Sequence, residues 1–390
     1  MKIRKILKRC TAAMLAAAIG MTTLAANVSA ATSGVSIGYT WNSSVNPTIK
    51  NRKNGVTGGV SGQYIKAGEQ ICRFSPSSTS DWAFCIEPAK SMQGASYKDW
   101  YTQNGFTKYD TFDLTDKNKA DSFAYWKSIG GTDGPMAKYL GLVQYYGYSS
   151  HKTGDYYAAT QCLIWELILG YRGHTQAGFG KCSDILWNDF TYPSGGWCTR
   201  SGVEKAYNDI VSNVKDHYKL PSAMKSTKAQ AKDEAHVMKY NAENLRYETK
   251  VTVPTSYVTA SSLAHNFSSL ESKLGSLIKS KFSGTFGKDY GLETEMSGTN
   301  TVYTIWSKER QFSSSGDSNI YVTESIPMQM KNSLKKQETL FANSYYQTCL
   351  LSTRLDPVVG YVGLASYNEP NLTVEKTYTC LLYTSPSPRD

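Results

Sequence analysis

The sequence lacks the cysteine spacing typical of zinc sites, because none of its eight cysteines belongs to a C-x-x-C pair. It also lacks a run of Lys or Arg interleaved with aromatic residues, so it gives no sign of nucleic-acid binding. Tandem repeats, heptad runs and low-complexity blocks are missing too, which argues against solenoids and coiled coils. These absences leave a globular protein, for which we expect no metal and no other cofactor.

The apolar run near the N-terminus, Ala12 to Ala26, is too short to span a bilayer. A basic segment precedes it, and Val28-Ser29-Ala30 then forms a small-x-small cleavage site. Residues 1–30 are therefore predicted to be the signal peptide of a secreted protein, with an uncleaved membrane anchor as the alternative. Removal of its five basic residues lowers the formal net charge from +10 to +5.

The length of 390 residues allows two domains. We predict an α+β chain with a first domain over 32–222, a polar linker over 223–235 and a mostly β second domain over 236–368. In the second domain the clearest strand patterns are 247–253, 301–307 and 319–325, and one helix is expected near 270–278.

In the first domain, alternation predicts a strand over 81–87, which ends because Pro88 cannot donate to a sheet ladder. Period two places Cys85 and Glu87 on one face of this strand. A helix is predicted after Pro135.

A second helix is predicted over 156–169. It is apolar nearly all round and therefore interior, and Asp155 is expected to cap it. A third helix begins at the capping box formed by Ser201 and Glu204 and ends before Pro221.

Two short strings in these elements carry the most functional information: FCIEP, which contains Cys85, and AATQCLIWE, which contains Gln161. Together they resemble the paired signature of the Cys-Gln thioester domains of Gram-positive surface adhesins. The resemblance covers the spacing, Pro88 and the TQ-x-x-IW string, and it extends roughly from Gly38 to Leu220. It implies a domain of β-strands packed on a small helical subdomain, in which the cysteine sulfur and the glutamine side chain condense with loss of ammonia.

The exchange of an amide for a thioester is uphill in water, because a thioester lacks most of the amide resonance. A fold that holds the sulfur against the carboxamide carbon can offset this, since such preorganisation is worth about 7–11 kcal/mol in favourable cases. The thiol must also ionise. Glu87 or Glu166 could take its proton, although each could equally be a structural charge.

Other residues near the two strings could assist the chemistry. Tyr156, Tyr157 and Thr160 could donate hydrogen bonds to a tetrahedral oxyanion, with a packing role as the alternative. Trp82, Phe84 and Trp165 could exclude water from the bond, a role compatible with ordinary core packing.

The resemblance also implies a use for the bond. A partner's amine, expected from a lysine, would attack the Gln161 carbonyl and free the Cys85 thiol, leaving an amide between two proteins. The chain would then be a cell-surface adhesin that captures a host or matrix surface protein covalently. It would react once and would not be a turnover enzyme.

Near the C-terminus, residues 369–379 contain the string NLTVEKT and resemble the start of a prealbumin-like stalk domain, in which Lys376 would form an isopeptide bond. Residues 380–390 resemble the translation of a sequencing adapter. We therefore expect the natural protein to continue past Thr379 and to be anchored in the cell wall through a region that is missing here.

The remaining cysteines leave their pairing open. Cys182 and Cys198 flank a Pro/Gly-rich loop and could form a disulfide or stay free. Once Cys10, Cys85 and Cys380 are set aside, five cysteines remain, an odd number for a closed disulfide set.

Three alternatives differ in class. Cys85 and Gln161 could be ordinary buried residues. Cys85 could be the nucleophile of a cysteine hydrolase, which needs one of the downstream histidines as a base. These are His151, His174, His217, His236 and His265. The 28 tyrosines and 8 tryptophans could instead form an aromatic face that binds a glycan or a protein noncovalently.

Overall fold

The computed structural model describes residues 31–50, 52, 63–90, 92, 98–110, 121–131, 135–259, 269–311, 322–329, 338–352 and 358–366. The predicted signal peptide, the stalk string with Lys376 and the C-terminal tail 380–390 lie outside these residues. Within the described part of the chain, no helix combines the length and apolar character needed to cross a membrane.

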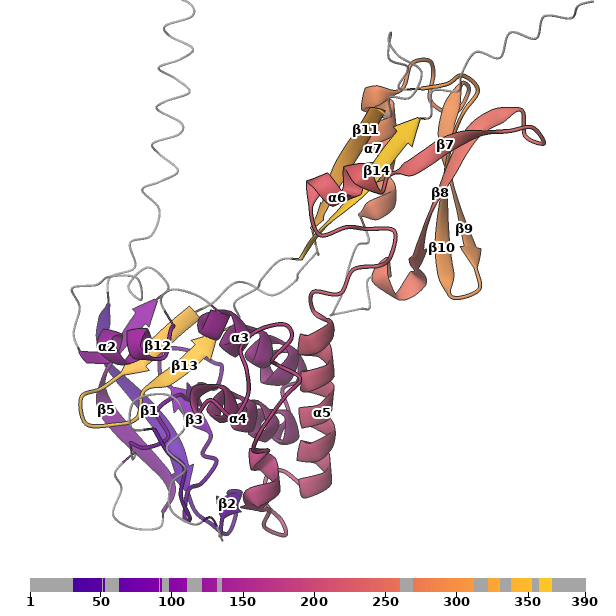
Figure 1. The fold of residues 1–390 in the computed structure, drawn as a ribbon. Coiled ribbons are helices and arrows are strands. Elements are labelled where there is room, and N and C mark those ends of the chain that lie inside the picture. Colours follow the sequence, from indigo (N-terminus) through magenta and orange to yellow (C-terminus); the bar gives the residue numbers. More distant parts are fainter. Residues whose placement is uncertain are drawn as a thin grey trace, which may run out of the picture. The chain divides into compact units, whose positions relative to one another are not determined.

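The protein has an α+β fold whose described elements form two compact units. The first unit contains the elements from the N-terminal strand to helix α5, together with the late strands β12 and β13. The second contains the elements from α6 to β11, together with β14. In Figure 1, β12 and β13 have the yellow-orange colour of the C-terminal part but lie among the indigo and purple strands of the first unit. The chain thus passes from the first unit to the second, returns to the first for β12 and β13, and enters the second again for β14. The prediction that 236–368 forms one continuous domain is wrong, because β12 and β13 interrupt it.

The first unit is built on a six-stranded sheet in which every described strand pair is antiparallel. Two of its strands, β12 and β13, come late in the chain and lie between β5 and β4, which explains why local alternation alone does not reveal this sheet. Its strands, in their order across the sheet, are β3 (Phe74–Pro76), β1 (Thr32–Trp41), β5 (Lys98–Asp110), β12 (Glu338–Ala342), β13 (Cys349–Ser352) and β4 (Phe84–Cys85).

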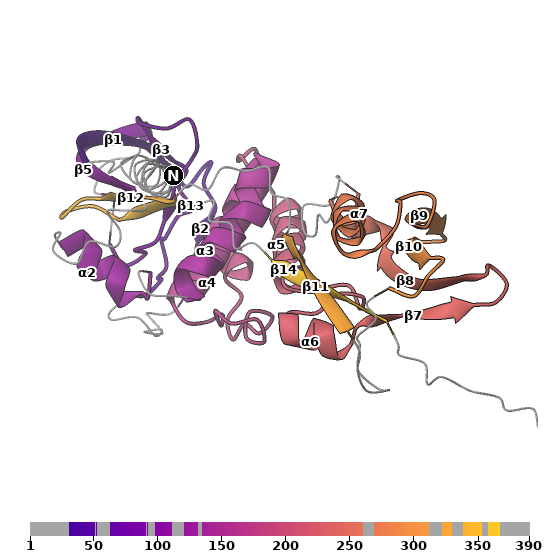
Figure 2. The same ribbon diagram turned by 90° about the horizontal axis from the view of Figure 1, so that it is seen from above.

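Helices α3, α4 and α5 pack against one another, α3 also contacts β13, and α4 contacts β4 (Figures 1 and 2). Helix α4 is interior, as its apolar sequence predicts, because every residue from Tyr157 to Ile168 is buried. The helices and short elements of this unit are α2 (Asp121–Ser128), α3 (Pro135–Gln144), the π-helix η2 (Tyr145–Ser149), α4 (Gly154–Ile168), the 3₁₀-helix η3 (Leu186–Asp189), α5 (Arg200–Asp216) and the strand pair β2 (Thr48–Ile49) and β6 (Phe190–Thr191).

The caps of α4 and α5 lie two residues before the predicted ones. Thr153 caps α4 by accepting from the Tyr156 backbone N–H, and Thr199 caps α5 by accepting from the Gly202 N–H. Asp155 has a different role, because its carboxylate accepts a 2.8 Å hydrogen bond from the Thr199 backbone N–H. It therefore ties the start of α4 to the start of α5.

The second unit has its own six-stranded sheet and its own core, in which α7 buries Leu270, Leu274 and Ile278. The predicted linker 223–235 belongs to this unit, since it contains a helix whose Ala231 is buried. That helix looks polar in sequence because Ala231 is its only buried residue. The elements are α6 (Lys228–Asp233), β7 (His236–Asn241), β8 (Arg246–Pro254), η4 (Thr255–Tyr257), α7 (Leu270–Lys281), β9 (Tyr290–Ser297), β10 (Asn300–Ser307), β11 (Val322–Gln329) and β14 (Val359–Ser366).

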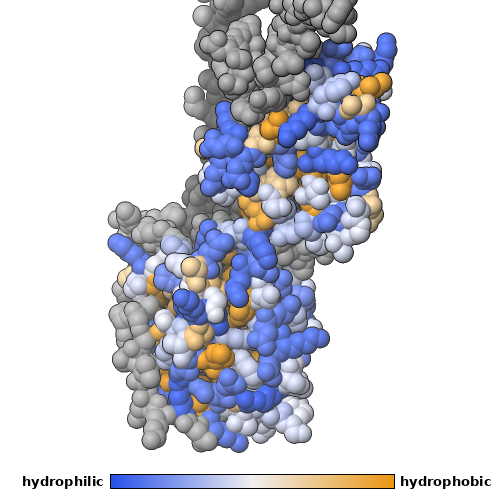
Figure 3. Space-filling model, turned by 45° about the vertical axis from the view of Figure 1, so that its right-hand side comes forward, coloured by the Kyte–Doolittle hydropathy of each residue, from blue (hydrophilic) through white to orange (hydrophobic). Residues whose placement is uncertain are grey.

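On the face drawn in Figure 3, hydrophobic residues form small patches separated by hydrophilic ones in both units. This face therefore offers no broad apolar surface, and the site must be sought from the chemistry of individual residues.

Candidate functional site

The structure brings Cys85 and Gln161 into direct contact through a reciprocal pair of hydrogen bonds. The Cys85 backbone N–H donates to Gln161 Oε1 at 2.9 Å, and Gln161 Nε2 donates to the Cys85 carbonyl at 2.8 Å. Both residues are fully buried. The carboxamide of Gln161 is therefore fixed against the residue that carries the candidate nucleophile.

This contact arises because β4 is the edge strand of its sheet. The Ile86 N–H bonds to the Thr348 carbonyl at 3.0 Å, so Ile86 faces β13. Cys85, its neighbour, directs its own N–H and C=O away from β13 toward α4. The side chain of Gln161 fills the position that a further strand would occupy, and this leaves no unpaired backbone group at Cys85.

Tyr157, one helical turn before Gln161, holds the chain on both sides of the site. Its hydroxyl lies 2.6 Å from the Ala83 carbonyl and 3.0 Å from the Cys72 carbonyl, and it accepts from the Phe74 N–H at 3.2 Å. With these partners Tyr157 positions β3 and β4, and it does not supply the predicted oxyanion donor.

The other two predicted oxyanion donors are also engaged elsewhere. The Tyr156 hydroxyl donates to Asp209 at 2.8 Å. The Thr160 hydroxyl donates to the Tyr156 carbonyl at 2.6 Å and accepts from the Tyr148 N–H at 3.1 Å. The group that does donate to the Gln161 carbonyl oxygen is the backbone N–H of Cys85, which a residue pattern cannot reveal.

Burial raises the pKa of the Cys85 thiol well above its ordinary value, and the neighbouring Cys349 raises it further. The Trp165 side chain and the Glu87 backbone N–H oppose this by favouring the thiolate. The buried indole N–H of Trp165 has no hydrogen-bond partner among the described residues. It therefore lies near the sulfur without forming a full hydrogen bond to it. Trp165 thus lies on the sulfur side of α4, as its four-residue spacing from Gln161 predicts.

The side chain of Glu87 is directed away from the thiol. Its Oε2 accepts from the Thr348 N–H at 3.1 Å and from the Thr348 hydroxyl at 2.8 Å. The Lys90 ammonium lies 3.6 Å from the same oxygen. Glu87 therefore joins the end of β4 to the start of β13, a structural role that sequence reasoning left open.

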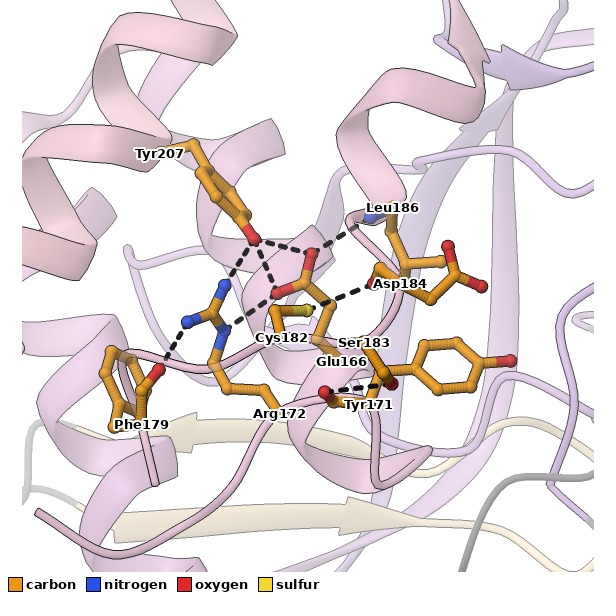
Figure 4. Close-up of polar contacts among 9 residues, drawn as sticks. All are labelled: Glu166, Tyr171, Arg172, Phe179, Cys182, Ser183, Asp184, Leu186 and Tyr207. Carbon is orange, nitrogen blue, oxygen red and sulfur yellow. Dashed lines mark hydrogen bonds and ion pairs between the residues drawn. The ribbon is translucent and has the colours of Figure 1, made fainter. Parts of the chain in front are cut away.

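Glu166 also has a structural role, on the opposite side of α4 (Figure 4). Its carboxylate, fully buried, accepts from Arg172 Nε at 2.8 Å, from the Leu186 N–H at 3.0 Å and from the Tyr207 hydroxyl at 2.7 Å. Arg172 continues the network by donating to the Phe179 carbonyl. Burial raises the pKa of Glu166, and the Arg172 charge opposes that shift. The predicted role of Glu166 as a base for Cys85 is not supported by these contacts.

A buried carboxyl that sequence reasoning missed acts electrostatically on the thiol. Glu69 is buried, and burial raises its pKa to about 7 while Lys66 opposes the shift. Its charge raises the pKa of both Cys72 and Cys85, so it lies within electrostatic reach of both sulfurs. No spacing links Glu69 to Cys85, because a loop preceding β3 brings it there.

Two of the three predicted shielding aromatics, Trp82 and Phe84, pack beside the site. The Phe84 ring stacks on Tyr157 with centroids 4.6 Å apart, and Trp82 meets the same ring edge-on at 5.4 Å. Tyr148 closes the cluster by stacking on Trp82 at 5.6 Å. This cluster covers the turn of α4 that precedes Gln161, and it also forms part of the core.

The disulfide between Cys182 and Cys198 is not present, because both residues are free thiols in different surroundings. Cys182 pairs with Arg172 in a β-bridge and donates to the Asp184 carbonyl at 3.1 Å (Figure 4). Cys198 is buried near Asp155. The loop between them therefore does not bring the two sulfurs together.

The described histidines lie in other environments. His151 stacks on Tyr156, His174 is exposed, and His217 contacts the Tyr146 hydroxyl at 2.7 Å. His236 belongs to the second unit, where it contacts the Ala223 carbonyl. His265 lies outside the described residues.

A polar cleft of about 640 Å³ opens beside the site. Tyr125 lines it, and the Tyr125 hydroxyl donates to the Ile86 carbonyl, one residue from Cys85. Other side chains lining the cleft are Glu87, Lys90, Asn104, Tyr109, Tyr345 and Thr348. The cleft thus reaches the strand end that carries the candidate nucleophile.

Comparison of this chain with protein-family models, curated proteins and solved structures finds no match. Among the described residues, no group of three or more His, Cys, Asp or Glu side chains is arranged to hold a metal ion. The function must therefore be argued from the Cys85–Gln161 pair itself.

Proposed function

We propose that the protein is a covalent surface adhesin in which Cys85 and Gln161 form an internal thioester. The observation that carries this proposal is the reciprocal hydrogen-bond pair between the Gln161 carboxamide and the Cys85 backbone. It holds a glutamine amide against a buried cysteine, within a sequence context that resembles that of adhesin thioester domains. In this proposal the chain is secreted, is anchored in the cell wall and captures an amine on a host or matrix protein.

The same contacts support a sequence of steps. The Cys85 thiolate attacks the Gln161 side-chain carbon and forms a C–S bond. The Cys85 N–H, 2.9 Å from Oε1, donates to the oxygen as negative charge develops on it. The C–N bond then breaks and the nitrogen leaves as ammonia, taking up the proton that the thiol lost.

In the second stage a partner's primary amine attacks the thioester carbon. The C–S bond breaks, the Cys85 sulfur takes up a proton, and an amide joins the partner to Gln161. The polar cleft beside Tyr125 offers a route from solvent to this strand end. Tyr125 lines the cleft and links it to the site, because its hydroxyl is bonded to the Ile86 carbonyl, one residue from Cys85.

Intact mass tests the proposal. The purified full chain should weigh less than its sequence by one ammonia, and methylamine should restore mass by adding to Gln161. Cys85→Ala should show neither effect. Cys182→Ser is the matched control, because it removes a free thiol outside the site and should keep both effects. A wild-type chain with its full sequence mass and no methylamine adduct would refute the proposal.

A second candidate function is noncovalent binding of a glycan or protein in the cleft. It is favoured by the tyrosines that line the cleft, among which Tyr345 is 79% exposed. Aromatic rings beside polar groups suit sugar and protein recognition. Cys85→Ala separates the two functions, because attachment that survives this substitution must be noncovalent.

A further inference from the structure

Cys349 lies directly opposite Cys85 in the ladder between β13 and β4. The Ile86 N–H to Thr348 carbonyl bond flanks this pair, and the Cys85 N–H is bonded to Gln161 and not to β13. Cys85 and Cys349 are thus a non-hydrogen-bonded antiparallel pair. In such pairs the Cα atoms are about 4.5 Å apart and the side chains lie on one face.

This geometry falls within the range of natural disulfides, whose Cα atoms are usually about 4.4–6.8 Å apart. Both residues are free thiols, and both are fully buried in the same core cluster. Cys349 also raises the pKa of the Cys85 thiol, which agrees with their closeness. Gln161 and Cys349 therefore both lie beside Cys85, Gln161 through the backbone of Cys85 and Cys349 as its cross-strand partner.

We propose that Cys85 and Cys349 form a cross-strand disulfide under oxidising conditions and that this bond prevents the thioester. The regulatory consequence rests on the function proposed above, whereas the disulfide does not. Because the pair is buried in the folded protein, the bond forms as β4 and β13 come together and before the core closes over them.

The reaction needs a low-molecular-weight disulfide as oxidant. The thiolate of one cysteine attacks that disulfide, forms a mixed disulfide and releases one small thiol. The thiolate of the other cysteine then attacks the protein sulfur of the mixed disulfide, forms the Cys85–Cys349 bond and releases the second small thiol. The two protein thiols lose two electrons and two protons, and the small disulfide gains them.

The sulfur of Cys85 can hold only one of these bonds. As a disulfide it cannot attack the Gln161 carbon, and the amide then stays intact. Reduction returns the thiol and allows ammonia to be lost. Cys349 would thus make formation of the reactive bond dependent on the redox state in which the chain folds.

Refolding followed by mass spectrometry tests this. The full chain is unfolded, reduced with a phosphine and refolded with or without oxidised glutathione, since a thiol reductant could itself open the thioester. With oxidised glutathione we expect a peptide that joins Cys85 to Cys349 and no loss of ammonia. Without it we expect loss of ammonia and no such peptide.

Two variants complete the test. Cys349→Ser should lose ammonia under both conditions, whereas Cys72→Ser, the control for another buried thiol near Cys85, should behave as wild type. The inference would be overturned if the wild type refolded with oxidised glutathione lacked the Cys85–Cys349 peptide. It would also be overturned if the fraction of chains that lose ammonia were the same with and without oxidised glutathione. If the joined peptide forms but no condition removes ammonia, the disulfide stands and the proposed thioester function fails.

Discussion

At the scale of single residues, the site depends on which groups surround the Cys85 sulfur. The backbone N–H of Cys85 donates to the Gln161 carbonyl oxygen, and Glu69 is a buried carboxyl with a pKa of about 7 whose charge acts on the thiol. Burial gives Glu69 this pKa at a cost in stability, because its charged form is poorly solvated in the fold.

That cost predicts how the free energy of unfolding depends on pH. The ordinary pKa of Glu69 is 4.5 and its folded value is about 7, so between these values the folded state binds a proton that the unfolded state has lost. Stability therefore falls as pH rises through this window and is unaffected by Glu69 below it. The shift corresponds to roughly 3 kcal/mol.

Glu69→Gln should remove this contribution. Urea unfolding at pH 4 and pH 8 should show that the wild type loses roughly 3 kcal/mol more stability between the two values than the variant does. Glu87→Gln is the control, because Glu87 is bonded to Thr348. A Glu69→Gln variant with the same pH dependence as wild type would contradict the prediction.

The sequence alone predicts the Cys85–Gln161 pair and the position of Trp165, because a strand and a helix each have a regular period that local residues reveal. It does not predict that the Cys85 backbone N–H donates to the Gln161 carbonyl oxygen, because a backbone group has no residue signature. It also misses Glu69, whose electrostatic effect on Cys85 depends on how a loop folds. For Thr160 and Glu166 the residue types suit the chemistry, but their hydrogen bonds are made elsewhere.

At the scale of elements, α4 presents different chemistry on two sides. One side carries Gln161 and Trp165 toward β4, and the other carries Glu166 into the network with Arg172 and Tyr207 (Figure 4). This network joins α4 to α5 and to the loop before η3. The network holds α4 on the side away from β4, so that Gln161 on the other side stays against this edge strand.

Arg172→Leu would leave the Glu166 carboxylate buried without its cation. Loss of one partner of a buried pair costs about 3–5 kcal/mol, and we expect a decrease of that size in the free energy of urea unfolding. Lys152→Leu is the matched control, because the Lys152–Asp81 pair is partly exposed and should contribute less than about 1 kcal/mol. Equal effects of the two substitutions would show that the buried network does not support α4.

The helices of the first unit follow their sequence periodicity closely, whereas their caps and the strand order do not. Thr153 and Thr199 are the caps that form, although Asp155 and Ser201 have equally suitable side chains. The choice depends on the contact between α4 and α5, which a local pattern does not contain. Local patterns are even less able to predict the pairing of β13 with β4, because Cys349 is far from Cys85 in sequence.

At the scale of the whole molecule, the first unit's sheet is divided between two parts of the chain, with elements α6 to β11 of the second unit between them. Strands β12 and β13 supply the ladder partners of β5 and β4, and they bury Leu340, Phe341, Leu350 and Leu351 in the core that contains Cys85. A fragment that ends at residue 222, where sequence reasoning placed the domain boundary, lacks these strands.

We therefore expect a fragment of residues 31–222 to be unfolded by circular dichroism and to keep its full sequence mass. A chain of residues 31–366 should fold and lose one ammonia. The cause is the loss of the β12 and β13 side chains from the core, together with two unpaired strand edges. Loss of ammonia by the short fragment would show that β13 is dispensable for the site.

The split sheet also sets an order of events. If the chain is exported from its N-terminus, Cys85 and Gln161 leave the cell long before the hairpin that completes their sheet has been delivered. The sheet around them is then incomplete until β12 and β13, which follow elements α6 to β11 in the chain, have crossed as well. On the function proposed above, the thioester then forms only outside the cell, where it does not meet the amines of the cytoplasm.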